Sequence, residues 1–156
     1  MQEFLSLVKN KNYEVLYITG KNYYDEFNKN KFSNNVKVVP YVENLSSLFK
    51  NTDIVVTRSG ASTISELVAL GIPSIYIPSP YVPNNHQYYN ALKLQENNAS
   101  LLIEEKALDS NDLLSKIDEL LENKELYFQM KNNLNKLAIK NSSELIYQVV
   151  KELINE

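Results

Sequence analysis

The segment between residues 53 and 91 constrains the fold more than any other part of this sequence, because it contains two strand–loop–helix corners in direct succession. The first corner is an apolar strand at 53–57, a short polar loop and a helix that carries Glu66. The second is a strand at 74–77, a loop broken by prolines and a helix that opens with Asn84. Helix N-termini present unpaired N–H groups and the positive end of the helix dipole to anions. The two corners therefore predict a site for a phosphorylated ligand.

The rest of the sequence extends this alternation of strands and helices. Further strands are predicted at 13–19, 36–39 and 101–104, and further helices at 2–9, 23–28 and 45–50. After Asp109 the apolar residues repeat every three or four positions, which predicts a helical C-terminal third. Asp109 or Ser110 would cap the first of its helices, and Ser142 or Ser143 the last. The pattern is typical of one Rossmann-like α/β domain over 1–156, in which a parallel sheet carries helices on both faces.

Glycine is rare in this chain, and its three occurrences coincide with the ends of predicted elements. Gly20 follows the strand at 13–19, Gly60 separates the strand and the helix of the first corner, and Gly71 ends that helix shortly before Pro73. These are the places where a chain needs special backbone angles, so the glycines support the predicted boundaries.

The composition excludes several classes of function. A chain of 156 residues with 44% hydrophobic and 22% charged residues fits one globular domain. The formal net charge of −3, without a basic stripe, argues against nucleic acid as a partner. No cysteine and a single histidine leave no ligand set for a thiolate or histidine-cluster metal site, so neither a metal nor a cofactor is expected. No apolar run has the length of a signal peptide or a membrane span.

The loop and the first helical turn of the first corner supply the main candidate ligand groups. Small residues let the backbone approach a ligand, and hydroxyls and free N–H groups bind phosphate oxygens. The candidates are Arg58, Ser59, Gly60, Ala61, Ser62, Thr63, Ile64 and Ser65. Arg58 can pair either with a phosphate or with an acidic neighbour. The stretch from Thr63 to Glu66 also matches a capping box, so an ordinary capped helix start is the alternative interpretation.

Further candidates lie on the first helix, on the second corner and in one loop. The Glu66 carboxylate can accept two hydrogen bonds from a ribose diol, or it can be a capping or solvated glutamate. Gln87 and Asn90 lie three apart on one helical face, and their amides suit sugar hydroxyls. His86 is either a ligand contact or a surface or capping histidine, and no partner for a general-base role is identifiable. Val42 lies in a loop at the same sheet edge, where its backbone can meet a nucleobase.

Two segments of the first and second corners, RSGASTISELVALGIPSIYIPSP and NNHQYYNA, resemble the signature of the MurG family of bacterial N-acetylglucosaminyltransferases. YITGK and VVPYVENL also match the pattern of this family. The resemblance runs from residue 1 to nearly 156 and is most specific over 58–90. Two looser relatives differ at the first corner. Other UDP-sugar transferases carry a His-Gly-Gly turn there, and the non-hydrolysing UDP-GlcNAc epimerases carry an Asp-Ser-Gly-Gly turn with paired glutamates.

The resemblance implies the C-terminal, donor-binding half of a GT-B glycosyltransferase. In the family, GlcNAc is transferred from UDP-GlcNAc to lipid I, which gives lipid II with inversion at the anomeric carbon during peptidoglycan synthesis. The implied contacts are the backbone of Val42 to the uracil, residues 61–63 to the diphosphate, Glu66 to the ribose and Gln87 to the GlcNAc hydroxyls, with His86 and Asn90 close by. The implied location is the cytoplasmic side of the bacterial cell membrane, with peripheral attachment.

The family also has parts that this sequence does not contain. An N-terminal domain binds lipid I, contacts the membrane and supplies the proposed catalytic base, and a GGSQG turn precedes the position of Met1. The sequence begins inside a predicted helix, so we expect a fragment without its first strand, its glycine-rich turn and the N-terminal domain. No catalytic residue is therefore assigned, and the chain alone should bind the donor weakly and not turn over. The alternative is a stand-alone nucleotide-sugar-binding subunit of a two-chain UDP-sugar transferase that acts on a lipid-linked acceptor.

Overall fold

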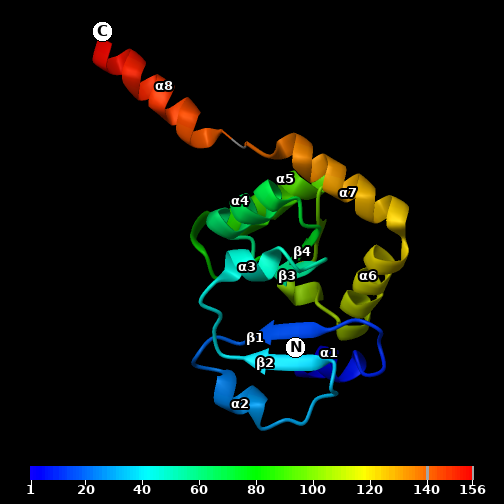
Figure 1. Cartoon of the computed structure of the whole chain (residues 1–156). Coiled ribbons are helices and arrows are strands. Elements are labelled where there is room, and N and C mark those ends of the chain that lie inside the picture. Colours follow the sequence, from blue (N-terminus) through cyan, green and yellow to red (C-terminus); the bar gives the residue numbers. More distant parts are fainter. Residues whose placement is uncertain (140, 156) are drawn as a thin grey trace.

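The computed structural model describes residues 1–139 and 141–155, in which helices and strands alternate as predicted (Figure 1). The strands are β1 (Val15–Ile18), β2 (Val36–Val39), β3 (Val55–Thr57), β4 (Ser74–Tyr76) and β5 (Leu101–Leu102). The α-helices are α1 (Gln2–Leu7), α2 (Tyr24–Asn28), α3 (Leu45–Phe49), α4 (Ala61–Leu70), α5 (His86–Glu96), α6 (Ser110–Glu122), α7 (Lys124–Leu137) and α8 (Ser142–Asn155). Two 3-10 turns, η1 (Pro83–Asn85) and η2 (Glu105–Ala107), precede α5 and α6.

All described strand pairs are parallel, which confirms the predicted α/β class. The strands form two sheets, one of order β1-β2 and one of order β3-β4-β5. In the first sheet Val15 lies opposite Val36, and in the second Val55 lies opposite Ser74. Parallel strands need crossover connections, and helices or helical turns supply each of them along the chain. Because all strands of a sheet point the same way, the loops after β3 and β4 leave the same edge.

Several predicted boundaries hold and others shift. The strand at Val36–Val39 and the cap of α6 by Asp109, whose carboxylate accepts from two N–H groups of the first turn, are as predicted. Gly71 ends α4 with a left-handed φ of 65°, and a Cβ there would lie 3.3 Å from Asn135 Oδ1. The helical region predicted after Asp109 is divided at Asn123, which follows α6 and precedes α7. The Asn123 side chain accepts a hydrogen bond from Leu126 N–H and thereby starts α7.

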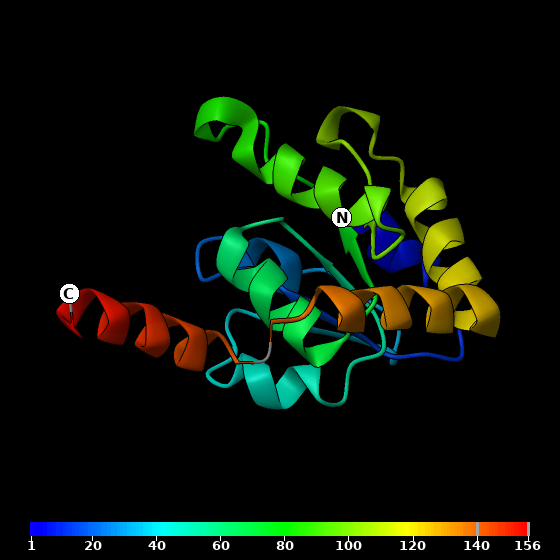
Figure 2. The ribbon, with the colours of Figure 1, turned by 90° about the horizontal axis from the view of Figure 1, so that it is seen from above.

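The hydrophobic core lies around β4, whose three residues are all buried. The helices of the two corners, α4 and α5, run side by side, and α4 also packs against α7 (Figures 1 and 2). Leu67 on α4, Ile75 on β4 and Leu134 on α7 are fully buried in the same cluster. The core therefore fixes the two corner helices relative to each other and to the strand between them.

The last helix, α8, extends away from the rest of the molecule in Figure 1. Its first hydrogen bond runs from Leu145 N–H to Asn141 O, one residue before the caps predicted at Ser142 or Ser143. Large apolar side chains of α8 are exposed, including Ile146, Val149 and Leu153. Among the residues that the structure describes, no helix has the length and apolarity that crossing a membrane requires.

Tyr76 at the end of β4 carries a buried hydroxyl, for which the described residues provide no hydrogen-bond acceptor. Burial raises the pKa of this phenol to about 12. The neighbouring Ser74 hydroxyl donates instead to the Ile72 carbonyl at 2.9 Å. An unpartnered buried polar group destabilises a fold. We therefore expect Tyr76→Phe to leave the free energy of unfolding unchanged or to raise it by up to about 1 kcal/mol.

Urea unfolding followed by circular dichroism tests this expectation. Tyr13→Phe is the matched control, because the Tyr13 hydroxyl donates to Asp118 Oδ1 at 3.1 Å. Loss of that charge-assisted bond should lower the stability by about 1.5–3 kcal/mol. A Tyr76→Phe variant that is less stable than the Tyr13→Phe variant would show that the Tyr76 hydroxyl has a partner.

Candidate functional site

The first corner ends in a helix start that no side chain caps. Gly60 occupies the cap position of α4 with extended backbone angles (φ −66°, ψ 144°), and its carbonyl accepts the Ile64 N–H at 3.0 Å. The predicted capping box is therefore wrong, because Thr63 is the third residue of the helix and not its cap. The N–H groups of the first three helical residues have no acceptor within a helix. They form a ready anion site together with the positive end of the helix dipole.

The space in front of this helix start is open. A Cβ built on Gly60 would meet no atom within 4 Å, and the side chains of Ala61 and Ser62 are exposed. The Ser65 hydroxyl bonds back to the Ala61 carbonyl at 2.9 Å, so it does not compete for the free N–H groups. Packing and backbone angles therefore do not require glycine at position 60, and the small residues leave room for a ligand.

The two corners are joined directly through Ser59, which is completely buried. The Ser59 hydroxyl donates to the Gln87 carbonyl at 2.7 Å, and the Asn90 amide donates to the Ser59 carbonyl at 3.3 Å. These bonds connect the loop after β3 to the first turn of α5. The structure thus brings together Ser59, Gln87 and Asn90, three of the predicted site residues, although 28 and 31 positions separate them in the sequence.

Gln87 is held by the loop that follows β4. Its Oε1 accepts the Ser79 N–H at 3.0 Å, which leaves the Nε2 amide free to donate to a ligand. Sequence reasoning missed Ser79, whose position between two prolines is the only local signal that it lies in a fixed turn. His86 is exposed, and its Nδ1 lies 2.9 Å from the Pro83 carbonyl. In the part of the chain that the structure describes, no carboxylate pairs with His86, so a catalytic dyad is not formed.

Arg58 pairs with an acidic neighbour, the second of the two predicted interpretations. Its guanidinium forms an ion pair with Glu105 of η2 and donates to the Ile77 and Pro78 carbonyls at 3.0 and 3.2 Å. These contacts join the end of β3 to the end of β4 and to the turn after β5. Arg58 therefore braces the carboxyl edge of the three-stranded sheet. Sequence reasoning did not find Glu105, because nothing in its local sequence points to Arg58.

Glu66 and Val42 lie on elements that are neighbours in space. Glu66 is exposed on the second turn of α4, and among the described residues its carboxylate makes no hydrogen bond or ion pair. Val42 is half-buried in the loop between β2 and α3, and α3 packs beside α4. The adjacent Tyr41 ring lies 5.9 Å from Lys21 Nζ, which connects this loop to the one after β1. Among the described residues, no hydrogen bond joins the Val42 backbone to α4.

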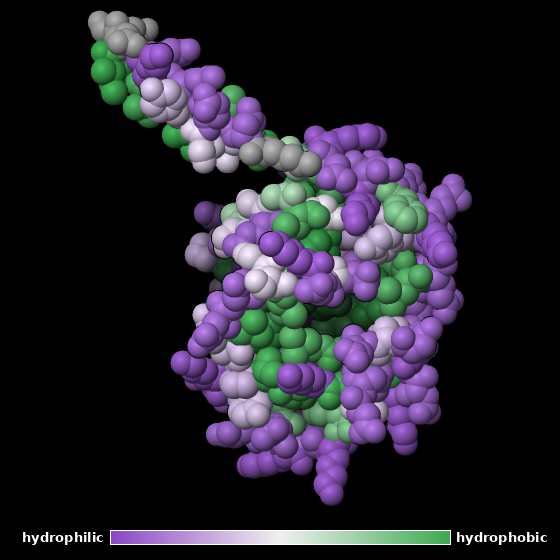
Figure 3. All heavy atoms as spheres, in the orientation of Figure 1, coloured by the Kyte–Doolittle hydropathy of each residue, from purple (hydrophilic) through white to green (hydrophobic). Residues whose placement is uncertain are grey.

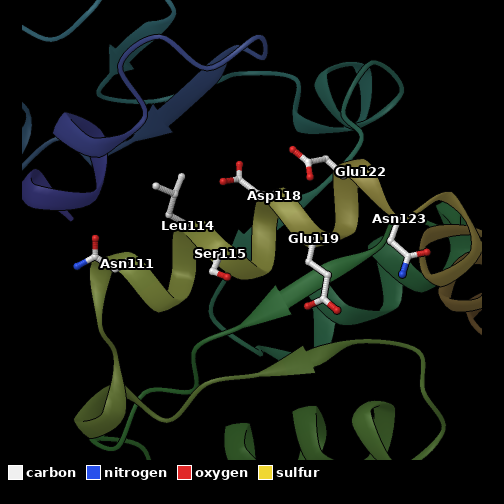
Figure 4. A pocket seen from close by; sticks show the side chains of 7 residues that line it. All are labelled: Asn111, Leu114, Ser115, Asp118, Glu119, Glu122 and Asn123. Atoms are coloured by element: carbon white, nitrogen blue, oxygen red, sulfur yellow. The ribbon is translucent and has the colours of Figure 1, made fainter.

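The structure also has a hollow whose lining contains none of these residues. It has a volume of about 620 Å³ and runs along α6, where Asp118, Glu119 and Glu122 project from different sides of the helix (Figure 4). Three carboxylates disfavour an anionic ligand electrostatically, and Asp118 is already paired with Lys11. Over residues 1–139 and 141–155, no group of three or more His, Asp or Glu side chains has the arrangement of a metal site. The α4–α5 corner is therefore the better candidate for a phosphorylated ligand.

The fold and the sequence are both similar to known glycosyltransferases. The chain is 42% identical over 151 residues to the UDP-N-acetylglucosamine–N-acetylmuramyl-(pentapeptide) pyrophosphoryl-undecaprenol N-acetylglucosamine transferase of Bacillus cytotoxicus, covering 94% of this chain and 42% of the relative. The enzyme of the same name from Thermoanaerobacter sp. is 41% identical over 159 residues, covering 98% and 43%. The chain thus spans well under half the length of these curated relatives.

Solved structures show the same architecture at low sequence identity. MurG from Acinetobacter baumannii superposes with a TM-score of 0.81 at 18% identity, covering 96% of this chain and 44% of that protein. The glycosyltransferase VinC, solved in complex with DTDP, superposes with a TM-score of 0.74 at 20% identity, covering 99% and 36%. Residues 1–146 match the model of the glycosyltransferase family 28 C-terminal domain. With this match over almost its whole length, the chain belongs to the glycosyltransferase family 28 C-terminal domain family.

Proposed function

We propose that this chain is the UDP-GlcNAc-binding half of the inverting glycosyltransferase that converts lipid I to lipid II in peptidoglycan synthesis. The observation that carries the proposal is the uncapped start of α4, which faces open space and adjoins the amide side chains of α5. The curated relatives at about 40% identity, whose names state this donor and this acceptor, support it.

The proposed contacts follow the order of groups in the donor. The N–H groups of residues 61–63 bind the diphosphate, with Gly60, Ser62, Thr63, Ile64 and Ser65 shaping the turn around it. The Glu66 carboxylate accepts the ribose hydroxyls, and the backbone of Val42 meets the uracil. The Gln87 Nε2 amide donates to GlcNAc oxygens, with His86 and Asn90 beside it. Arg58 and Ser59 do not contact the donor in this proposal but hold the loop between β3 and α4 in place. Arg58 does so through its ion pair with Glu105, and Ser59 through its hydrogen bonds to α5.

The chemical role of this half is to stabilise the leaving group. In an inverting transfer the acceptor hydroxyl displaces UDP directly, and negative charge develops on the diphosphate as the glycosidic bond breaks. The start of α4 provides N–H donors and the positive end of the dipole at that position, so it stabilises the charge where it develops. The base that deprotonates the acceptor hydroxyl, the lipid I site and the peripheral contact with the cytoplasmic face of the membrane belong, in this proposal, to the N-terminal domain of the enzyme.

A substitution at Gln87 tests whether the second corner binds the sugar. Gln87→Glu keeps an Oε1 acceptor for the Ser79 N–H and removes the Nε2 donor. We expect affinity for UDP-GlcNAc to fall about fivefold more than affinity for UDP, because one neutral hydrogen bond contributes about 1 kcal/mol, whereas repulsion from the new carboxylate weakens both anionic ligands alike.

Isothermal titration of both ligands into the transferase that contains this domain provides the measurement. Gln95→Glu on the same helix is the control, because its Oε1 likewise accepts a backbone N–H, that of Leu102, at the far end of α5. Equal losses for UDP and UDP-GlcNAc in the Gln87→Glu protein would contradict a specific sugar contact. An unchanged affinity for UDP-GlcNAc would also contradict it.

A further inference from the structure

Glu105, in the turn η2 after β5, has a partly buried carboxylate. Hydrophilic residues cover most of the outer part of the molecule in Figure 3, as is usual for charged side chains. The Glu105 Oε2 atom is instead buried, and it is the atom that pairs with Arg58 Nη1. The turn fixes the backbone here, because the Glu105 carbonyl accepts the Leu108 N–H at 3.2 Å and the preceding carbonyl accepts the Ala107 N–H at 2.9 Å. Glu105 therefore holds its charge at a defined point beside the candidate site.

A single nitrogen atom of Arg58 connects this carboxylate to the loop after β4. Nη1 contacts Glu105 Oε2 and also donates to the Ile77 and Pro78 carbonyls at 3.0 and 3.2 Å. The guanidinium group is planar, so a carboxylate that accepts one Nη1 proton sets the direction of the other. That leaves the second proton for the two carbonyls. The ion pair therefore orients the donor that holds the loop after β4.

The peptide unit between Pro78 and Ser79 transmits this orientation to Gln87. Its carbonyl accepts from Arg58, and its N–H donates to Gln87 Oε1 at 3.0 Å. A peptide unit is planar, so its two ends cannot turn independently. Hydrogen bonds at both ends of one amide also polarise and strengthen each other. The contacts from Glu105 through Arg58 and this peptide unit to Gln87 thus form one relay.

We propose that Glu105 is a positioning residue for the sugar of the donor, which sets the preference of the site for UDP-GlcNAc over UDP without contacting either ligand. With Oε1 held by the Ser79 N–H, the Gln87 amide has only its Nε2 protons to offer a ligand. The relay fixes where those protons lie. The proposal rests on the proposed function, because Gln87 must contact GlcNAc for its orientation to matter. The relay itself does not depend on any ligand.

The relay acts on the second corner and not on the groups proposed for the diphosphate. Those groups are N–H groups of α4, which follow Gly60 in the chain. Ser59, between Arg58 and Gly60, is held separately by its own hydrogen bonds to α5. Loss of the Glu105 carboxylate should therefore weaken the sugar contact more than the diphosphate contact. The ratio of the affinities for UDP-GlcNAc and UDP isolates that difference.

Calorimetric titration of both ligands into the transferase that contains this domain tests the proposal. In the Glu105→Ala protein we expect the ratio to fall about threefold, a large part of the about fivefold effect expected from loss of the Gln87 bond. Glu104→Ala is the matched control, because Glu104 is the adjacent carboxylate and pairs with Lys106 at 3.0 Å, outside the relay. It removes the same charge and should leave the ratio unchanged.

Two further variants separate positioning from a general loss of structure. Glu105→Gln keeps an oxygen that can accept from Arg58 and should restore most of the ratio. In the Gln87→Glu protein, Glu105→Ala should lower the ratio no further, because the group that it positions is already gone. The proposal would be overturned by an unchanged ratio in Glu105→Ala, by an equal fall in Glu104→Ala, by no rescue in Glu105→Gln, or by losses that add in the double variant.

Amide hydrogen exchange at Ser79 tests the relay without a ligand, because this N–H is the one that bonds to Gln87 Oε1. We expect it to exchange about tenfold faster in the Glu105→Ala protein. The Leu102 N–H, which bonds to Gln95 Oε1 near the other end of α5, is the internal control and should not change. An unchanged Ser79 rate would overturn the proposal. Faster exchange, with no binding of UDP-GlcNAc to the unchanged protein, would uphold the relay and contradict the proposed function.

Discussion

Replacing Ala61 by proline is expected to leave the fold intact and to weaken UDP-GlcNAc binding by about 10- to 100-fold. Position 61 is the first residue of α4, where proline is well tolerated because its missing N–H has no partner inside the helix. Gly60 already has the extended backbone angles that a residue before proline requires. The substitution therefore removes one N–H from the proposed diphosphate site, and a hydrogen bond to a charged group contributes about 1.5–3 kcal/mol.

The control for this prediction is Ser110→Pro, at the first position of α6. Asp109 precedes it with ψ 139°, and the Asp109 carboxylate accepts from Asn111 and Asp112 but not from Ser110. The two variants therefore make the same backbone change at two helix starts. Thermal unfolding should show both proteins folded, and calorimetric titration should show weakened binding only for Ala61→Pro. Equal donor affinity in the two folded variants would contradict the diphosphate assignment.

Glu66→Gln is expected to weaken binding of UDP by about 10- to 100-fold, because the carboxylate would lose charge-assisted hydrogen bonds to both ribose hydroxyls. Glu66 is exposed and makes no ion pair with the described residues, so its replacement should not change the stability of the fold. Glu122→Gln on α6 is a control for the loss of one negative charge from an exposed helix position. The measurement is the affinity for UDP by calorimetry.

A second ligand isolates the ribose contact. The affinity for 2′-deoxy-UDP should already be low in the unchanged protein, and Glu66→Gln should reduce it much less than it reduces the affinity for UDP. The difference between the two losses is the coupling energy between the carboxylate and the 2′-hydroxyl. Equal losses for the two nucleotides would contradict the ribose assignment and would leave Glu66 with a general electrostatic effect only.

Features that depend on local sequence were predictable. The strand at Val36–Val39, the end of α4 at Gly71 and the cap at Asp109 each follow from residues within one turn of the feature, and the structure confirms them. The resemblance to a known family was carried by short segments in a fixed order, and the match over residues 1–146 confirms the family.

Features that depend on competing or distant signals were not predictable. Thr63 and Glu66 have the spacing of a capping box. However, β3 ends at Thr57 and α4 already begins at Ala61, with Gly60 at its cap position. Asn123 is compatible with an exposed helical position, and only the structure shows that its side chain caps α7. The bonds from Ser59 to α5 and from Arg58 to Glu105 join residues that become neighbours only through the packing of whole elements. For the same reason the division of the strands into two sheets could not be derived from the sequence.

The central claim is that this domain binds UDP-GlcNAc at the corner between α4 and α5. The most direct test is a calorimetric titration of UDP-GlcNAc into the transferase that contains this domain, in its unchanged form and with Ala61→Pro and Glu66→Gln combined. The account predicts saturable binding at a single site in the unchanged protein and loss of most of the binding free energy in the folded double variant. Saturable binding of equal affinity in both proteins would contradict the account.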